Sequence, residues 1–443
     1  MNRFFKSIYF QLRVFVAIFG IAVIFLFSYW IPPLYALAWI LAVLLLLFTF
    51  LDAIILFSKK GIAARRILPE KLSNSDQNPI NIQLQNGYNF KVFIEIIDEV
   101  PIQFQKRDFF KKIEIPARKK SRFEYSVRPV KRGEYQFGKL NLYVSTSLKL
   151  VKKRRIFDED QKVKVYPSFI QMKQYDFLAI DNKLRQVGLK RIRRIGHTQE
   201  FEQIKEYVPG DDTRSINWKA TAKHANLMVN QFQDEKAQPV YSLIDTGRVM
   251  KMPFKGLSLL DYSINSCLAF SNVALKKKDK VGMLSFSNQT GNLVPASSNK
   301  THLQKLLESL YNIKTQFLDT DFGLLYSVVK RQIKQRSLLM IYTNFEHMNA
   351  LERELPFLRA LSKKHVVVII FFENTELDKI IQNKVKTVSE IAHQTIAEEF
   401  AFEKRLMARK LQQNGIQTLL TRPEDLSINT INKYLEIKAR GLL

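Results

Sequence analysis

The chain has 443 residues, more than one typical domain needs, and can hold a membrane segment and two separate hydrophobic cores. Its 69 Lys and Arg outnumber its 41 Asp and Glu, which gives a formal net charge of +28. Such an excess suits anionic lipid, an acidic protein or nucleic acid, and we favour a place beside an anionic lipid leaflet over nucleic-acid binding. The single Cys267 excludes an intramolecular disulfide.

Two uncharged, strongly apolar segments, residues 14–31 and 34–51, stand near the start of the chain. Each is about the length that crosses a hydrocarbon core of ~30 Å. Pro32 and Pro33 separate them and leave room only for a tight turn, so residues 1–60 are predicted to form a transmembrane helical hairpin. A signal peptide is the alternative for the first segment, but no small-residue cleavage site follows it and a second span comes at once.

Basic residues flank this hairpin: Arg3, Lys6 and Arg13 before the first segment, and Lys59, Lys60, Arg65 and Arg66 after the second. By the positive-inside rule both ends lie in the cytoplasm. We therefore expect a multi-pass protein of the plasma (inner) membrane that contacts the bilayer through residues 14–57 and keeps its soluble domains in the cytoplasm. Asp52 is expected to reach the interface or to pair with another helix rather than to relay protons.

Residues 61–167 change to short runs in which apolar and polar residues alternate, such as KVFIEIID at residues 91–98. Turn residues punctuate these runs at Asn86, Gly87, Pro101, Pro116 and Gly133. Alternation at period two predicts antiparallel strands in a small β-sandwich-like domain. Its basic loops are expected to be solvated, with docking to a membrane surface or a partner as the alternative.

Residues 168–235 are predicted to link the two soluble domains. Six basic residues between Lys183 and Arg194 indicate an exposed arm. Beyond this arm, Pro209 begins a turn, and an aspartate after it is expected to cap a short helix that starts near Thr213.

On such a helix Arg214 and Trp218 are four residues apart and share a face, which permits a joint clamp on a partner. Two interpretations stay open. The charged residues of the turn form an internal ion-pair network that fixes the linker to the sheet, or they form a docking site for another protein. The candidate partner-binding residues are Glu206, Tyr207, Asp211, Asp212, Arg214, Trp218 and Lys219.

Residues 236–443 alternate buried β-branched strands with helical segments. Strands are predicted at VYSLID, KVGMLSF, LLMIYT, VVVIIFF and IQTLL, with helices near residues 257–275, 299–312, 321–334, 349–363, 388–413 and 424–438. This order indicates an α/β domain with a mostly parallel sheet covered on both faces. The fold class is therefore multidomain: a transmembrane helical hairpin, a β-sandwich-like domain and a C-terminal α/β domain.

A family pattern runs through the charged turn and its surroundings, at Glu206, Tyr207, Pro209, Gly210, Asp211, Asp212, Arg214, Ile216, Trp218, Lys219 and Ala220, with KRGEYQFG upstream and Asp245 downstream. In order and spacing it resembles the bacterial family catalogued as domain of unknown function 58. The resemblance implies a membrane hairpin, a small β domain and a von Willebrand factor A-like domain, often encoded beside MoxR-type AAA+ ATPases. This chain departs from the family at Lys205, Asn217 and Lys223; lysine lacks the two-point contact of arginine, so partner contacts there are expected to be looser or rearranged.

The resemblance also implies a metal-site position after the first strand of the α/β domain, with Ser residues at the third and fifth places of its loop. Here the corresponding positions are Asp245, Gly247, Val249, Thr320 and Asn344. One carboxylate and one threonine make a poor cage for a divalent cation, which prefers several oxygen ligands. We therefore expect no tightly bound metal, and we expect Asp245 to pair with Arg248 or with a basic group of a partner.

No other catalytic device is evident, because the six histidines are scattered and no phosphate-binding or nucleophile motif is present. The sequence predicts a non-enzymatic membrane-anchored scaffold or adaptor without a cofactor. By the resemblance, its partner is a MoxR-type AAA+ ATPase, served in a chaperone-like assembly role. The contact is expected to combine the motif at residues 200–223 with the sheet edge at Asp245. The alternatives are a magnesium-dependent adhesion-type module and nucleic-acid binding through the basic arm.

Overall fold

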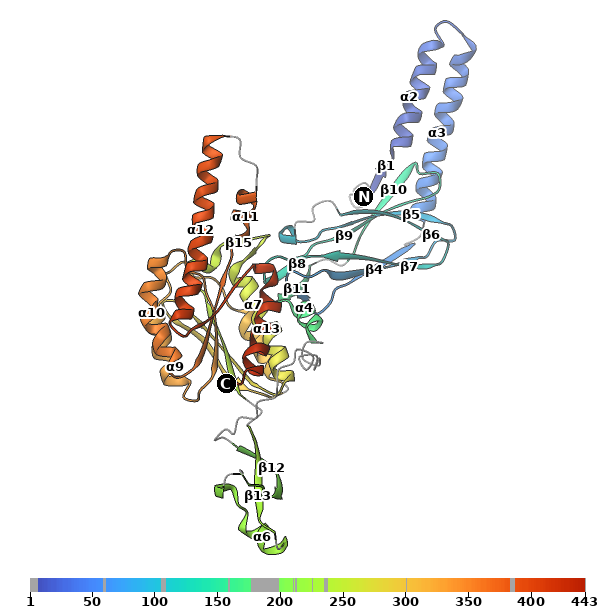
Figure 1. The fold of residues 1–443 in the computed structure, drawn as a ribbon. Coiled ribbons are helices and arrows are strands. Elements are labelled where there is room, and N and C mark those ends of the chain that lie inside the picture. The colour runs from blue at the N-terminus through green and yellow to red at the C-terminus, as the bar shows by residue number, and fades with distance from the viewer. Residues whose placement is uncertain are drawn as a thin grey trace. The chain divides into compact units, whose positions relative to one another are not determined.

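A computed structural model describes residues 7–58, 61–104, 109–157, 160–176, 199–209, 211, 213–224, 226–234, 238–299, 301–382 and 387–442. The chain divides into two compact units, Met1–Tyr166 and Pro167–Leu443, each of which is described by itself. Figure 1 shows both as a ribbon. The basic arm predicted between residues 183 and 194, Gly210 and Asp212 lie outside the described residues.

The first unit opens with two apolar helices, α2 (Leu12–Phe27) and α3 (Pro33–Phe57), which pack together as a hairpin. The turn lies at the predicted prolines. Of the described residues, only Pro33–Phe57 form a helix whose length and apolar composition would let it cross a membrane. The 16 residues of α2 rise only about 24 Å, less than the ~30 Å of a hydrocarbon core. Two complete spans are therefore not supported.

The rest of the first unit is built from three small sheets. One has the order β1-β10-β9-β5-β6, formed by Ile8–Phe10, Val151–Phe157, Leu140–Ser145, Val92–Asp98 and Phe110–Ile115. A second has the order β2-β4-β7, formed by Ile62–Ile67, Asn78–Asn86 and Lys120–Val127. The third has the order β3-β11-β8, formed by Lys71–Ser73, Gln161–Tyr166 and Gly133–Phe137. Every pairing is antiparallel except β3 with β11, so the predicted antiparallel strands are confirmed.

Asp52 of α3 is a docking group. Its side chain is fully buried and accepts hydrogen bonds from Thr146 Oγ1 (2.5 Å), Leu150 N (3.2 Å) and Val151 N (3.0 Å). The expectation that Asp52 would reach a membrane interface or pair with another helix is wrong. The carboxylate instead holds the turn between β9 and β10, whose two backbone N–H groups need an acceptor once α3 covers them.

The last turn of α3 is fastened in the same way. The carbonyl oxygen of Leu56 accepts from Tyr88 Oη (2.7 Å) and Lys153 Nζ (2.8 Å). At the other end of the hairpin, β1 pairs with β10. Both ends of the helical hairpin are therefore attached to the same five-stranded sheet. The start of α2 and the end of α3 are thereby held next to each other.

We expect Asp52→Ala to speed hydrogen exchange at the amides of Leu150 and Val151 by about tenfold or more, because a buried donor without its acceptor costs about 1–3 kcal/mol. Asp52→Asn keeps one acceptor oxygen and is expected to exchange close to wild type. Exchange measured by mass spectrometry on the detergent-solubilised chain tests this, with the exposed Glu124→Ala as control. Unchanged exchange in Asp52→Ala would remove the docking role.

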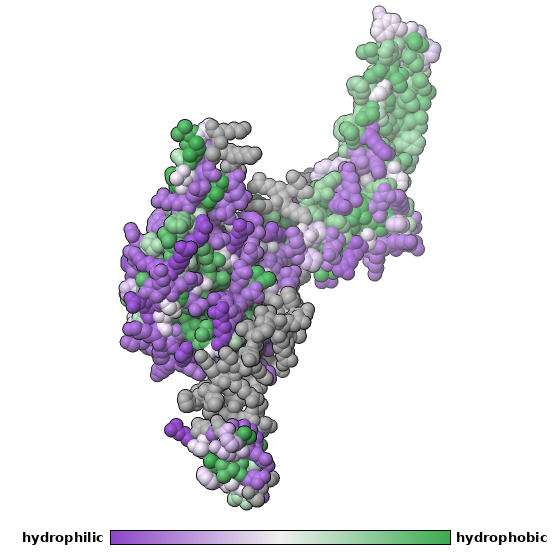
Figure 2. Space-filling model, viewed as in Figure 1, coloured by the Kyte–Doolittle hydropathy of each residue, from purple (hydrophilic) through white to green (hydrophobic). Residues whose placement is uncertain are grey.

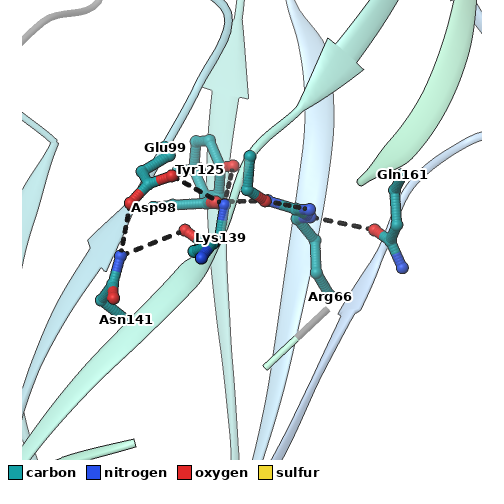
Figure 3. A network of polar contacts seen from close by, with 8 residues as sticks. Arg66, Asp98, Glu99, Tyr125, Lys139, Asn141 and Gln161 are labelled. Atoms are coloured by element: carbon teal, nitrogen blue, oxygen red, sulfur yellow. Dashed lines mark hydrogen bonds and ion pairs between the residues drawn. The ribbon is translucent and has the colours of Figure 1, made fainter. Parts of the chain in front are cut away.

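A buried ion pair joins strands of the three small sheets (Figure 3). The Arg66 guanidinium on β2 lies 2.5 Å from Asp98 Oδ1 at the end of β5, and neither side chain is exposed. Arg66 also donates to Gln161 Oε1 on β11 (2.9 Å) and to the Gly138 carbonyl (2.9 Å), while Tyr125 Oη on β7 donates to Asp98. Because Arg66, Asp98 and Tyr125 are buried and hydrogen-bonded, the network fixes the register of the sheets relative to one another.

The second unit contains a six-stranded sheet with the order β18-β17-β14-β19-β20-β21. Its strands are Thr290–Ser297, Lys280–Phe286, Pro239–Asp245, Leu338–Tyr342, Val366–Phe372 and Gln417–Thr421. All pairings are parallel except β17 with β18, which confirms the mostly parallel sheet. Every residue of β14 is buried, as its continuous apolar run predicts for a central strand. The edge strand β18 was not predicted, because its residues do not alternate between apolar and polar and none of them is buried.

Helices cover both faces of this sheet (Figure 1). They are α7 (Leu259–Lys276), α8 (His302–Tyr311), α9 (Phe322–Gln332), α10 (Met348–Ser362), α11 (Thr375–Gln382), α12 (Val388–Gln413) and α13 (Leu426–Ala439), and the short α4 (Phe169–Gln174) packs on α7. Helix α7 contacts α8 and α13, whereas α10 contacts α9 and α12. The six predicted helices are confirmed, and α11 is an addition. Four short elements lie around the carboxyl ends of the sheet strands. They are η4 (Arg248–Lys251), β15 (Pro253–Phe254), β16 (Leu257–Ser258) and η5 (Pro423–Asp425).

Candidate partner-binding hairpin and the Asp245 edge

The charged motif forms a β-hairpin with helical turns between its strands. Strand β12 (Gln199–Glu206) pairs antiparallel with β13 (Met228–Asp234). Between them lie the 3₁₀ turn η3 (Thr213–Ser215) and the helix α6 (Trp218–His224). The predicted single helix from Thr213 is wrong: the chain breaks at Ile216, which forms a bridge with Val229, so Arg214 and Trp218 belong to different elements.

Asn217 caps the helix that carries the tryptophan. Its Oδ1 accepts from Ala220 N (3.0 Å), and its Nδ2 donates to Asn230 Oδ1 on β13 (2.8 Å). The side chain thus satisfies a free helix N–H and ties α6 to the strand behind it. The residue that departs from the family pattern is therefore the cap, in place of the expected aspartates.

Asp211 does not cap a helix, as was predicted, but holds the turn after β12. It accepts from Lys205 Nζ on β12 (2.8 Å) and from Val208 N (3.1 Å). The hydrogen bond from Lys205, helped by that from Val208, holds the pKa of the Asp211 carboxyl below its usual value. Lys205, the second departure from the family pattern, closes the turn after β12 with a one-point ion pair.

The other predicted motif residues lie on the same hairpin. Glu206 Oε1 accepts from Asn226 Nδ2 (3.1 Å), and Tyr207 N donates to the Leu227 carbonyl (2.8 Å). Arg214 and Lys219 are exposed on η3 and α6. The contacts of Asp211 and Glu206 stay inside the hairpin, so they brace its loops rather than fix it to the six-stranded sheet.

Large apolar side chains are exposed on this braced hairpin. They are Trp218 (70% exposed), Val208 (57%), Leu227 (41%) and Ile204 (40%). Apolar surface among polar residues is visible here in Figure 2. Exposed apolar side chains on a rigid support are typical of protein contact sites.

Asp245 ends β14 and is fully buried. Its Oδ1 accepts from Thr320 Oγ1 (2.6 Å) and Gly247 N (2.8 Å), and its Oδ2 accepts from Thr343 Oγ1 (2.7 Å). Burial raises the pKa of this carboxyl, while the three hydrogen bonds act in the opposite direction. Asp245 is therefore satisfied by neutral donors of its own domain.

The predicted pairing of Asp245 with Arg248 is wrong. The Arg248 guanidinium is exposed and lies 3.7 Å from Asp319 Oδ1 and 3.9 Å from Glu346 Oε2. The chain turns into η4 directly after Gly247, which carries the arginine away from the buried carboxylate.

The remaining metal-site positions also differ from a cation cage. A Cβ at Gly247 would lie 2.1 Å from Thr320 Oγ1, so the loop has closed over the place where a serine would stand. Val249 offers no side-chain oxygen, and Asn344 Oδ1 accepts from Lys404 Nζ (2.8 Å). The described part of the chain holds no group of three or more His, Cys, Asp or Glu side chains placed for a metal. The donor set at Asp245 does not fit a divalent ion.

The predicted positions Asp245, Gly247 and Thr320 do lie together, whereas the contacts of Thr343 and Lys404 were not predicted. Thr343 could have been found, because it follows β19, the neighbour of β14, and carboxyl ends of parallel strands share an edge. The hairpin joins β14 at its amino end, whereas Asp245 lies at its carboxyl end. The two halves of the predicted contact are therefore attached to opposite ends of the same strand.

Residues 203–387 match the family model described as "Protein of unknown function DUF58". The Bacillus subtilis (strain 168) protein described as "Uncharacterized protein YeaD" is 23% identical over 256 residues, which are 56% of this chain. The match spans 61% of that relative's length. The two findings support a relationship to the DUF58 family.

Two solved structures of the CARDB domain of the PF1109 protein from Pyrococcus furiosus also match, each at 10% identity over 24% of this chain. One is a solution structure, matched over 94% of its length with a TM-score of 0.16. The other is a crystal structure in complex with di-metal ions, matched over 86% of its length with a TM-score of 0.17.

Proposed function

We propose that the protein is a membrane-anchored, non-enzymatic scaffold or adaptor that binds a cytoplasmic protein through the hairpin of residues 199–234. Its α/β domain is interpreted as a degenerate von Willebrand A-like domain, an interpretation supported by the mostly parallel sheet with helices on both faces. The family resemblance suggests a MoxR-type AAA+ ATPase as the partner and an assembly role that resembles that of a chaperone. The observation that carries the proposal is the exposure of Trp218 on a support that is hydrogen-bonded within itself.

The hydrogen bonds within the hairpin matter because a tryptophan contributes most to binding when its surroundings lose little conformational entropy on forming the complex. Asn217 fixes the start of α6 immediately before Trp218 and joins it to β13. Lys205 and Asp211 fix the turn that precedes η3, where Arg214 lies. Trp and Arg are the residue types that most often dominate the free energy of protein contacts.

The membrane anchor of the proposal rests on α2 and α3. Their side chains are mostly apolar and exposed, and Figure 2 shows the apolar surface of this hairpin. In this proposal α3 inserts into the bilayer with the shorter α2 packed against it, while β1 and Leu56 hold both ends of the helix pair on the side of the five-stranded sheet. The basic residues around the hairpin favour the cytoplasm for that side.

Affinity capture with the detergent-solubilised chain tests the contact. We expect Trp218→Ala and Arg214→Ala each to reduce recovery of the ATPase by about tenfold or more, since loss of a dominant contact costs about 2 kcal/mol. The matched control is Val388→Ala, which removes a side chain that is 85% exposed on α12. Equal recovery by the wild type and both hairpin variants would refute the proposal.

A further inference from the structure

A cavity of about 560 Å³ lies at the carboxyl ends of β19, β20 and β21, where they meet α11 and α12. This is the edge at which open parallel sheets bind ligands, and the volume is typical of a small-molecule site. Its apolar wall includes Phe254, Phe372, Leu377, Phe400 and Leu420. These side chains come from separate elements, so the wall is built by the fold rather than by one helix.

The polar side of the cavity contains a cation, Lys404, on which Glu403 and Glu346 act only from beyond ion-pair distance. Lys404 of α12 is half-buried, and its Nζ donates to Asn344 Oδ1 (2.8 Å) and to the Phe345 carbonyl. Both acceptors are neutral, and no carboxylate among the described residues lies within ion-pair distance of Nζ. An ammonium has three N–H donors, so one remains for a ligand. Burial also lowers the pKa of Lys404, to about 8.

The acids that line the cavity already face other cations. Glu373 and Asp378 lie 4.0 and 3.3 Å from the Arg422 guanidinium, and Glu346 lies 3.9 Å from that of Arg248. Arg405, next to Lys404, donates to the Ala401 carbonyl of its own helix, makes no ion pair within the described structure, and acts on Glu373 only at longer range. Among the described residues that line the cavity, the two cations that make no ion pair are therefore Lys404 and Arg405, adjacent residues of α12.

From this arrangement we propose that the cavity binds a small amphipathic carboxylate. The carboxylate would accept from Lys404, with Arg405 at the rim, and the apolar body would lie against Phe254, Phe372 and Phe400. A carboxylate neutralises a partly desolvated ammonium, whereas an alcohol only accepts a hydrogen bond. This ligand site is independent of the hairpin that carries the proposed partner contact.

The test is calorimetric titration of the full chain in lipid nanodiscs with phenylbutyrate, phenylbutanol and phenylbutylamine, which share an apolar body and differ in charge. We expect saturable binding of phenylbutyrate that is about tenfold tighter than that of the other two, the size of a charge-assisted hydrogen bond. Lys404→Met is expected to remove this preference. Lys410→Met, the same change on the same helix at a lysine paired with Glu352, is expected to keep it.

The comparison among the three probes uses the wild type alone, so it does not depend on whether a variant folds. Absence of saturable phenylbutyrate binding would overturn the proposal, as would equal binding of the three probes. Preserved preference in Lys404→Met would equally overturn it, because the carboxylate would then have another receptor. None of these outcomes bears on capture of a protein through Trp218.

Discussion

Arg66→Ala is expected to lower the free energy of unfolding of the first unit by about 3–5 kcal/mol, because it leaves a buried carboxylate without its counter-ion. Asp98 then keeps the hydrogen bond from the Tyr125 hydroxyl but loses its counter-ion, and Gly138 O and Gln161 Oε1 lose a donor. Burial and the negative charge of Asp98 raise the pKa of Tyr125, so its hydroxyl stays a donor. Denaturant unfolding of the detergent-solubilised chain, followed by hydrogen exchange at the amides of β2 and β5, measures the loss.

A double-mutant cycle separates the ion pair from the packing of its side chains. Arg66→Ala with Asp98→Ala is expected to cost less than the sum of the two single changes, since no buried charge remains unpaired. The control is the exposed pair Lys91 and Glu114, where Lys91→Ala is expected to cost under about 1 kcal/mol. A loss in Arg66→Ala no larger than in Lys91→Ala would contradict the role assigned to the network.

Asp245→Ala is expected to destabilise the α/β domain by about 2–4 kcal/mol, because two buried hydroxyls and the Gly247 N–H lose their acceptor. Asp245→Asn is expected to cost under about 1 kcal/mol, since an amide can accept from Thr320 and Gly247 and donate to the Thr343 hydroxyl. Thermal unfolding of the three proteins side by side measures both differences.

The pH dependence of that comparison has a defined sign. Because burial raises the pKa of Asp245 above its usual value, its contribution to stability is full below that usual value and is lost as pH rises through the folded-state pKa. Asparagine does not titrate, so stability relative to wild type should shift in favour of Asp245→Asn as pH rises over this range. The control is Asp319→Asn, on the exposed side of the same edge. Damage by Asp245→Asn as large as that by Asp245→Ala would show that the negative charge itself is required.

Much of the fold follows from residue patterns. The seven buried residues of β14 and the alternating pattern of β4 are compatible with few structures other than a strand, because a strand removes their apolar side chains from water. Both strands were predicted from these patterns. The strands that were missed, such as β1 and β18, lie at sheet edges and are each held by one neighbouring strand. Tertiary context decides such segments, and local pattern does not.

The sequence predicted where the candidate sites lie, but it predicted only some of the hydrogen bonds and ion pairs that their residues make. The motif led to Trp218 and to Asp245, yet spacing along the chain did not reveal that Thr343 reaches across from the next strand or that Arg248 turns outward. The cap at Asn217 was missed because two aspartates stood near the expected helix start. Lys404 lies 60 residues from Asn344, so only the fold brings them together.

The central claim is that the braced hairpin, and not the Asp245 edge, binds the partner. It is tested most directly by the dissociation constant of the purified ATPase for the wild type, Trp218→Ala and Asp245→Asn in one magnesium-containing buffer. We predict that Asp245→Asn binds like the wild type and that Trp218→Ala binds at least about tenfold more weakly. Unchanged affinity in Trp218→Ala together with lost affinity in Asp245→Asn would contradict the account and place the contact at a charged, cation-dependent edge of the sheet.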